Sequence, residues 1–284
     1  MIQVKELEFV CQKSGKKAIR KIDFSIEQGE IFGFLGPSGA GKTTTQRILI
    51  GLLRGYVGSV LIMGKERKKW NNDFYEKIGV AFDFPNLYIK LTAQENLELI
   101  SSYYQKKAHN IDTLLDRLGL LPDKDKKVEG FSKGMKMRLN FIRSLMHDPD
   151  ILFFDEPTSG LDPVNAKIIK DMIMELKHQG KTIFLTTHNM TVAEQLCDRV
   201  AFIVDGQIPV IDSPRELMVQ HGTQTVKLDY YSEGKEYSEE FPLKTIQQNE
   251  CFFDILHKCE IKRIHSQEAT LEDIFIKLTG RELG

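Results

Sequence analysis

The sequence predicts an α/β fold in which buried strands and helices alternate around a glycine-rich turn. Three mainly apolar runs, at 31–35, 151–154 and 182–186, have the composition of strands that are buried on both faces of a sheet. A helical pattern at 164–178 separates the second and third runs, so these segments form a strand–helix–strand unit. The glycine-rich turn at 36–43 directly follows the first run and leads into a further helical pattern.

Three other regions surround this core. Residues 2–10 and 21–26 alternate between apolar and polar side chains, which predicts an antiparallel β subdomain. Residues from about 85–146 have a helical pattern and predict a helical insert subdomain. The composition changes in the last quarter of the chain, where strand and helix patterns mix. We therefore expect one domain at 1–212 and a small α+β accessory region at 213–284.

The bulk composition limits the possible classes of function. The chain has 284 residues, of which 41% are hydrophobic, and a net charge of −1. Proteins that bind nucleic acid broadly carry a basic excess, so we expect no nucleic-acid partner. The four cysteines lack zinc-site spacing, and no apolar stretch approaches the roughly 18 residues of a membrane span. The N-terminus has a strand pattern rather than that of a signal peptide, so we expect a cytoplasmic chain that acts on membranes through a partner.

The glycine-rich turn has the spacing of a phosphate-binding loop. It fits the pattern G-x-x-x-x-G-K-[ST] with Gly36, Pro37, Ser38, Gly39, Ala40, Gly41, Lys42 and Thr43. Small residues let backbone N–H groups surround phosphate oxygens, and the helix from Thr44 onward points its positive end at them. Lys42 is expected to neutralise the β- and γ-phosphates of a nucleotide, and Thr43 to bind Mg²⁺. The strand before the loop and the helix after it argue against a chance match.

Two carboxylates, Asp155 and Glu156, end the second buried strand. Ligands of α/β sheets bind at the carboxyl ends of the strands. Asp155 would hold Mg²⁺ directly or through water, and Glu156 would polarise the attacking water. The alternative is that both residues only cap the next segment, but a phosphate loop in the same chain favours catalysis. His188 follows Thr186 and Thr187 at the end of the neighbouring strand and is expected to contact the γ-phosphate.

A Ser-x-Gly turn precedes the acidic strand. Ser132 can cap the helix that follows, and this structural role explains the residue by itself. A capped helix start that contains Gly134 also presents free N–H groups to a phosphate. Because an insert separates this turn from the loop at 36–43, we expect it to serve the nucleotide of a second copy of the domain.

The order of these motifs resembles that of the ATP-binding cassette (ABC) family, in which two ATPase domains clamp ATP and usually drive a membrane transporter. The resemblance covers at least residues 2–212. It implies a P-loop nucleoside triphosphate hydrolase core with β and helical subdomains, and ATP and Mg²⁺ as cofactors. The family motifs are then the Walker A loop, the Walker B strand, the signature, the D-loop and the switch histidine, which place functional residues at Lys42, Asp155, Glu156, Ser132, Gly134, Asp162 and His188.

The resemblance also implies two protein partners. One is a multi-span membrane permease, which would hold this chain peripherally on the inner face of the cell membrane. The other is a second copy of the chain or a related ATPase subunit. The segment 270–275 resembles an accessory region that is common in single-cassette exporters. Aromatic and apolar residues near the motifs are the candidate permease contact, although core packing is the commoner role of such residues. They are Phe84, Pro85, Leu87, Tyr88, Tyr103 and Tyr104.

Three positions depart from the family pattern. The signature carries Lys133 and Met135 in place of a glycine and a glutamine, and Lys133 adds a positive charge. Asp83 stands where the family has the Q-loop glutamine; it can still approach Mg²⁺ or water, although it is shorter and charged. Cys11 stands where the family has an aromatic residue that stacks on adenine.

Two other functions stay open at this point. One is a soluble ABC ATPase that acts on ribosomes or DNA, against which the single cassette and the near-neutral charge argue. The other is a nucleotide-binding regulatory subunit with little turnover, for which the three departures argue. Glu156 and His188 argue against this second alternative.

Overall fold

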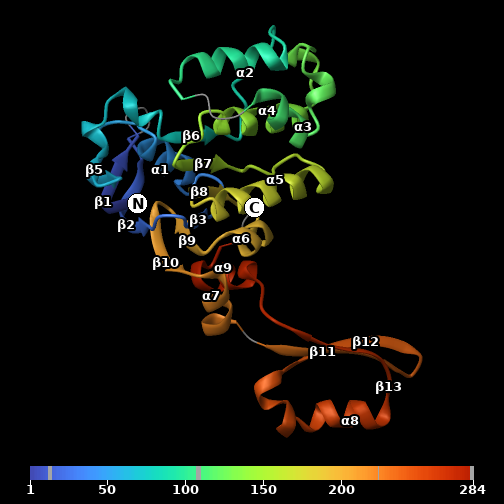
Figure 1. The fold of residues 1–284 in the computed structure, drawn as a ribbon. Coiled ribbons are helices and arrows are strands. Elements are labelled where there is room, and N and C mark those ends of the chain that lie inside the picture. Colours follow the sequence, from blue (N-terminus) through green and yellow to red (C-terminus); the bar gives the residue numbers. More distant parts are fainter. Residues whose placement is uncertain (12–14, 107–109, 223, 282–284) are drawn as a thin grey trace. The chain divides into compact units, whose positions relative to one another are not determined.

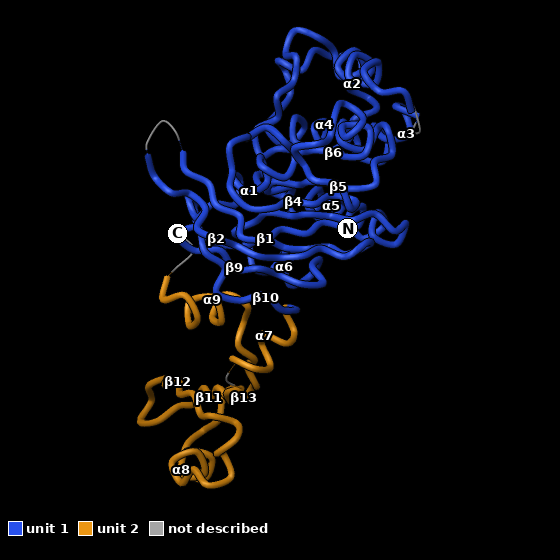
Figure 2. Tube along the Cα trace, turned by 90° about the vertical axis from the view of Figure 1, so that its left-hand side faces the viewer, with its two compact units in different colours: residues 1–213, 283–284 blue, residues 214–282 orange. Residues whose placement is uncertain are grey.

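The chain forms two compact units, at residues 1–213 and 214–282, which have different colours in Figure 2. No helix in the described part of the chain is long and apolar enough to cross a membrane. The computed structural model describes residues 1–11, 15–106, 110–222 and 224–281.

The first unit contains a six-stranded sheet with the order β10-β9-β3-β8-β7-β6 (Figure 1). All neighbouring strands are parallel except β9 and β10. Strands β3, β7 and β8 are buried along their whole length, which explains their continuous apolar sequence. The strands are β3 (Ile31–Leu35), β6 (Ile78–Ala81), β7 (Ile151–Asp155), β8 (Thr182–Thr187), β9 (Arg199–Val204) and β10 (Gln207–Asp212).

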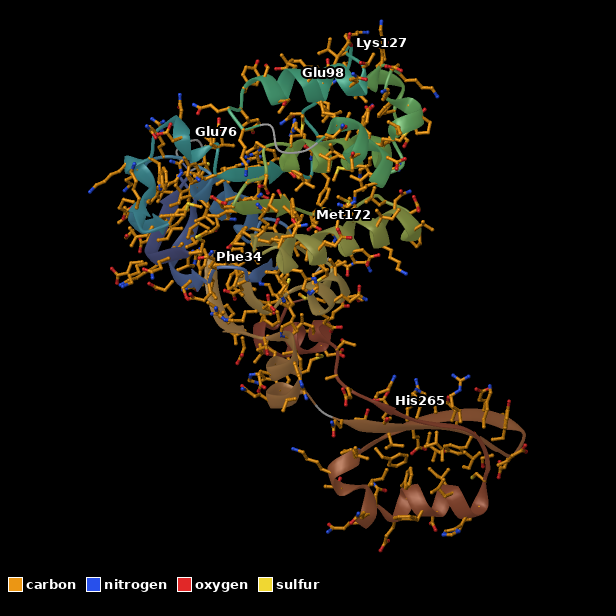
Figure 3. All side chains as sticks on the ribbon, in the orientation of Figure 1. Phe34, Glu76, Glu98, Lys127, Met172 and His265 are labelled. Atoms are coloured by element: carbon orange, nitrogen blue, oxygen red, sulfur yellow. The ribbon has the colours of Figure 1, made fainter. Side chains whose placement is uncertain are left out.

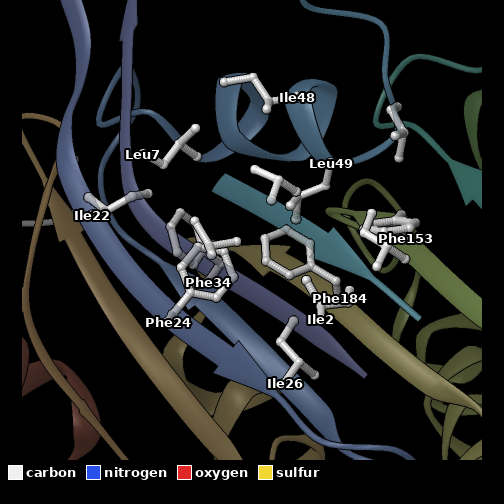
Figure 4. Packing of buried hydrophobic residues seen from close by; sticks show 14 of the residues in the cluster. Ile2, Leu7, Ile22, Phe24, Ile26, Phe34, Ile48, Leu49, Phe153 and Phe184 are labelled. Carbon is white, nitrogen blue, oxygen red and sulfur yellow. The ribbon is translucent and has the colours of Figure 1, made fainter. Parts of the chain in front are cut away.

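A four-stranded antiparallel sheet, β2-β1-β4-β5, shares a hydrophobic core with the large sheet and with α1 (Lys42–Leu49). In this core the ring of Phe34 lies 5.5 Å from that of Phe24 and 5.4 Å from that of Phe184 (Figure 4). Each such aromatic pair contributes about 0.5–1.5 kcal/mol beyond its buried area, so the core fixes the small sheet on the large one. The small sheet consists of β1 (Ile2–Val10), β2 (Lys17–Ile26), β4 (Val57–Ile62) and β5 (Lys65–Glu66).

The helical insert contains α2 (Ala93–Ser102), α3 (Ile111–Arg117) and α4 (Lys133–Leu145). A capping box of Thr92 and Glu95 begins α2, as its sequence predicts. Helix α4 packs on the large sheet, where the ring of Phe141 lies 4.9 Å from that of Phe154 of β7. The insert also holds two 3-10 turns, at Leu121–Asp123 and Val128–Gly130.

Helix α5 (Pro163–His178) connects β7 to β8, and α6 (Met190–Leu196) connects β8 to β9. Met172 of α5 is buried, whereas Glu98 and Lys127 are exposed side chains of the insert region (Figure 3). Met172 belongs to the apolar stripe that α5 presents to the sheet.

The second unit contains a three-stranded antiparallel sheet with the order β12-β11-β13. The amphipathic helix α8 packs against it, and the ring of Phe252 lies 5.2 Å from that of Phe241. Together with Leu228 these side chains form a core that is separate from that of the first unit. The elements are α7 (Pro214–His221), β11 (Thr225–Ser232), β12 (Lys235–Pro242), α8 (Glu250–Lys258), β13 (Glu260–Gln267) and α9 (Leu271–Thr279), with a 3-10 turn at Leu243–Gln248.

The structure confirms the predicted α/β fold class. The helix predicted from Thr44 onward begins two residues earlier, because α1 begins at Lys42, and it ends at Leu49. Gly51 follows with φ of 83°, a left-handed conformation that ends a helix. Two further 3-10 turns, at Arg67–Lys69 and Asn72–Phe74, precede β6.

Candidate nucleotide-binding and catalytic site

The register of the parallel strands brings three motifs to one edge of the large sheet. Leu35 at the end of β3 pairs with Thr187 of β8, and Asp155 at the end of β7 pairs with Thr186. The segments that follow these strands therefore emerge side by side at the carboxyl edge, where α/β sheets bind ligands.

The glycines of the loop after β3 are required by its geometry. Gly39 and Gly41 have φ of 75° and 119°, which glycine adopts without steric cost. A Cβ atom on Gly36 would lie 2.1 Å from the carbonyl oxygen of Ile203 in β9, so this position must also lack a side chain. Gly41 begins α1 without a side-chain cap, which leaves the first N–H groups of the helix available to phosphate oxygens.

Lys42 is folded back over this loop. Its Nζ donates to the carbonyl oxygen of Gly36 and, at 3.1 Å, to that of Pro37. Burial lowers the pKa of Lys42, while the nearby carboxylates of Glu156 and Asp155 act in the opposite direction. A partly desolvated ammonium attracts an incoming phosphate more strongly than an exposed one does.

Thr43 and Asp155 form a pair of oxygen ligands beside the loop. The Oγ1 atom of Thr43 lies 3.4 Å from Oδ2 of Asp155, and the Thr186 hydroxyl donates to Oδ1. Asp155 is only 3% exposed. Burial raises the pKa of Asp155 above the ordinary range. The hydrogen bond from Thr186 lowers this pKa, and repulsion from Asp83 and Glu156 raises it further.

This pair fits a magnesium ion, which prefers oxygen donors and takes few of them from the protein when phosphates supply others. No group of three or more His, Cys, Asp or Glu side chains in the described ranges is arranged to hold a metal alone. Metal binding at Thr43 and Asp155 would therefore depend on nucleotide oxygens.

Glu156 is held by donors on both of its carboxylate oxygens. The Thr187 hydroxyl donates to Oε2 at 2.9 Å, and the backbone N–H of His188 donates to Oε1 at 2.9 Å. The His188 ring Nδ1 lies 2.6 Å from the same Oε1. Glu156 has φ of 50°, a strained conformation for a residue other than glycine, of the kind that clusters at active sites. The carboxylate thus has one fixed orientation at the sheet edge.

These groups face a cavity of about 930 Å³, a volume suited to a nucleotide. Gly36, Pro37 and Ala40 shape the loop but do not line the cavity. The predicted site residues that do line it are Ser38, Gly39, Gly41, Lys42, Thr43, Thr44, Asp83, Asp155, Glu156 and His188.

Ser132, Gly134 and Asp162 lie outside the wall of this cavity. Ser132 caps α4 by accepting from the N–H of Met135 at 3.2 Å, which is the structural role weighed in the sequence. Asp162 caps α5 by accepting from two backbone N–H groups at 3.1 Å each. These caps use the Ser132 and Asp162 side chains within their own helices and leave them outside the chain's own cavity.

Sequence reasoning missed several residues of the site. Ala18, Lys136 and Ser159 line the cavity without having been assigned to the nucleotide, and Lys133 lines it beside them. The structural role of Thr187 was also missed, and the only signal for it is its position directly before His188. Cys11 does not line the cavity.

Comparisons with known proteins agree with this geometry. The chain matches the ABC transporter family over residues 19–159 and the fluoroquinolone efflux ABC transporter C-terminal domain family over residues 224–268. It is 48% identical to a fluoroquinolones export ATP-binding protein of Mycobacterium tuberculosis (strain CDC 1551 / Oshkosh), across 100% of this chain and 94% of that protein.

Two further similarities extend this result. The chain is 34% identical to Nod factor export ATP-binding protein I of Burkholderia pseudomallei (strain 1710b), across 94% of both chains. Its fold matches a dimeric ATP-binding cassette in a post-hydrolysis state, bound to ADP and Pi, with a TM-score of 0.68 and 26% identity. That match covers 75% of this chain and 98% of the cassette.

Proposed function

The chain belongs to the ABC transporter family as an ATP-binding subunit and is an ATPase, and we propose that it powers an exporter through ATP-driven pairing of two such domains. The observation that carries the proposal is the fixed Glu156 carboxylate, which faces the same cavity as Lys42, Asp155 and His188. Charge neutralisation and water positioning, the two main requirements of phosphoryl transfer, are both met there.

Each residue has a definite part in this proposal. Lys42 exchanges its two loop carbonyls for the β- and γ-phosphates of ATP. Thr43 and Asp155 would hold Mg²⁺, which would neutralise phosphate charge. Glu156 accepts a hydrogen bond from the attacking water, and His188 keeps the Glu156 carboxylate oriented. The expected contact of His188 with the γ-phosphate stays a prediction. The charged Asp83 lies on the cavity wall, close enough to interact with Asp155.

Pairing supplies what the cavity of a single chain lacks. Ser132 and Gly134 lie outside the chain's own cavity, at the start of α4. We therefore assign them, with Asp162, to the nucleotide of the opposite subunit, which is a second copy or a related chain. The first unit would then be the ATPase domain, and the second unit an accessory domain of the kind named in the C-terminal match.

The membrane partner is a multi-span permease, which places the chain on the cytoplasmic face of the cell membrane. A groove of about 260 Å³, lined by Leu52, Tyr104 and Arg143 among others, is its proposed docking surface. Of the predicted contact residues, Tyr104 lines this groove, and its neighbour Tyr103 is 67% exposed. Phe84 and Pro85 instead line the nucleotide cavity. Fluoroquinolones are the first substrates to test, because a relative 48% identical over the whole chain is named for their export.

The Glu156→Gln variant tests the mechanism. This variant keeps nucleotide binding but loses the carboxylate that orients water. ATP with Mg²⁺ should therefore hold it as a dimer, which sizing chromatography detects. ATP hydrolysis by the assembled complex should be lost. A variant that stays monomeric would contradict pairing by ATP. A variant that hydrolyses ATP like the parent complex would instead favour the low-turnover regulatory function. Co-purification of the tagged chain with a multi-span protein from solubilised membranes tests the partner.

A further inference from the structure

A second cavity, of about 450 Å³, lies between the C-terminal end of α1 and the residues that follow β5. The glycine at position 51 and the aromatic residues Tyr56, Trp70 and Tyr75 form part of its wall. It does not share a lining residue with the nucleotide cavity. No residue of the motifs discussed above lines it.

The charges around this cavity have one sign. Arg54, Arg67 and Lys68 line it, and no Asp or Glu does so among the described residues. None of these three cations has a carboxylate partner within ion-pair distance in the described structure. The nearest acid in sequence, Glu66, accepts a hydrogen bond from the hydroxyl of Ser59 at 2.5 Å and does not line the cavity.

Arg67 is the least usual of the three cations, because it is only 8% exposed. Its Nε and Nη2 donate to the carbonyl oxygens of Leu49 and Ile50, at 3.1 and 2.9 Å. Its guanidinium lies 3.9 Å from the centre of the Phe74 ring. Burial lowers the pKa of Arg67, and the charge of Arg54 contributes in the same direction. The two carbonyls and the Phe74 ring offset only part of the cost of burying this cation, because none of them carries a full negative charge, and an anion in the cavity would offset more of it.

The aromatic part of the wall suits an organic group beside the anion. Lys68 donates to the Tyr56 carbonyl at 3.2 Å and lies 4.2 Å above the Tyr56 ring. The buried hydroxyl of Tyr56 has no hydrogen-bond partner among the described residues. Trp70 has its Nε1 tied to the Ile62 carbonyl at 3.2 Å, which leaves its ring as an apolar surface.

We propose that this cavity binds a phosphate ester, with Arg54 and Lys68 against the phosphate and the aromatic wall against the esterified group. Arginine and lysine are the usual partners of phosphate, and the volume exceeds what a bare inorganic anion needs. The ester comes either from an anionic lipid headgroup or from a soluble metabolite. The lipid source rests on the proposed function, because only a membrane partner brings the chain to a bilayer.

The chain contains one tryptophan, Trp70, so its fluorescence reports directly on this cavity. The full chain is titrated with glycerol 3-phosphate, and separately with phosphatidylcholine vesicles that contain or lack phosphatidylglycerol. We expect a saturable change in emission with the ester, with the anionic vesicles, or with both. Binding to vesicles is also measured by co-sedimentation, so that a silent fluorophore does not hide it.

Variants then locate the binding. Arg54→Gln and Lys68→Gln should each weaken it about fivefold, the effect of one basic residue near an anionic surface. Both should leave basal ATP hydrolysis unchanged, since neither residue lines the nucleotide cavity. Lys69→Gln is the matched control, because Lys69 is exposed and adjacent in sequence but does not line the cavity. Arg67 is left intact because it braces the end of α1.

Each outcome decides the proposal. A response to glycerol 3-phosphate identifies a soluble ester, and a response to anionic vesicles alone identifies a lipid headgroup. The loop at 36–43 can also bind phosphate, so the titrations are repeated on the Lys42→Ala variant. If the response is lost in that variant, the ester binds in the nucleotide cavity and the proposal is overturned. The proposal is also overturned if neither glycerol 3-phosphate nor the anionic vesicles bind, or if Lys69→Gln weakens binding as much as Arg54→Gln and Lys68→Gln do. None of these results depends on whether the assembled complex exports a substrate.

Discussion

The Thr187→Val substitution tests whether the orientation of Glu156 limits hydrolysis. Thr187 is 1% exposed, and its hydroxyl donates to Oε2 of Glu156 at 2.9 Å while it accepts from the N–H of Asn189 at 3.0 Å. Valine has nearly the same shape but no hydroxyl. The substitution therefore removes one of the donors that hold the carboxylate and changes little of the packing.

The size of the effect follows from the remaining contacts. A hydrogen bond to a charged group contributes about 1.5–3 kcal/mol. Glu156 keeps both of its contacts with His188, at 2.9 Å from the backbone N–H and 2.6 Å from the ring, so we take the lower end of this range. About 1.5 kcal/mol of lost transition-state stabilisation corresponds to about a tenfold lower kcat. KM for ATP should change little, because the lost bond does not involve the nucleotide.

The assay is steady-state ATP hydrolysis by the assembled complex, with Thr182→Val as the matched control. Thr182 is fully buried at the opposite end of β8, where its hydroxyl accepts from the N–H of Gly29 at 3.0 Å. Thr187→Val should lower the free energy of unfolding by about 1.5 kcal/mol and Thr182→Val by about 1 kcal/mol. Only Thr187→Val should lose kcat. Equal kcat values in the two variants would refute the positioning role of Thr187.

Three further substitutions have expected outcomes. Lys42→Ala removes the phosphate partner and should weaken ATP binding about tenfold to a hundredfold, measured by calorimetry. Asp155→Asn should abolish Mg²⁺-dependent hydrolysis yet raise the unfolding free energy of the nucleotide-free chain by about 1 kcal/mol, measured by thermal unfolding. The reason is that burial raises the pKa of Asp155, so the folded chain binds a proton on this carboxyl more tightly than the unfolded chain does. The contribution of Asp155 to stability therefore falls as pH rises through its pKa in the folded chain. The difference in unfolding free energy between the Asn variant and the parent should grow over the same pH range. Gly51→Ala would place a Cβ atom 1.7 Å from Nη2 of Arg67 and should cost about 1–3 kcal/mol more in denaturant unfolding than Gly55→Ala, which has the same φ of 83° and no atom within 4 Å.

The nucleotide cavity was largely predictable because its chemistry depends on short, contiguous patterns. The spacing from Gly36 to Thr43 dictates a loop that curls around phosphate, and the structure gives Gly39 and Gly41 the positive φ angles that this loop needs. The acids at Asp155 and Glu156 follow an uninterrupted apolar strand, whose burial on both faces is visible in composition alone. Motif and strand pattern therefore agreed in placing these residues at one sheet edge.

Other features depend on contacts between distant segments and leave no local pattern. The cavity beside α1 is closed by Arg67, which reaches the carbonyl of Leu49 across 18 positions of sequence. The early end of α1 has the same origin, since Gly51 must lack a side chain where the Arg67 guanidinium approaches it. For Ser132, both the capping role and the position outside the chain's own nucleotide cavity follow from the sequence, whereas the capping of α5 by Asp162 was not predicted.

Helix α1 connects the two cavities, and its dipole explains why their cations differ in role. Its first N–H groups face the nucleotide loop, where a positive helix end and Lys42 both attract phosphate. Its last carbonyls carry the opposite partial charge and accept from Arg67. Two donors of the Arg67 guanidinium are therefore already used by the helix end. Most of the affinity of the second cavity for a phosphate ester must then come from Arg54 and Lys68. The double variant of these two residues should therefore weaken ester binding about 25-fold while Arg67 keeps α1 folded. Unchanged unfolding of this variant in denaturant would show that binding, and not structure, is lost.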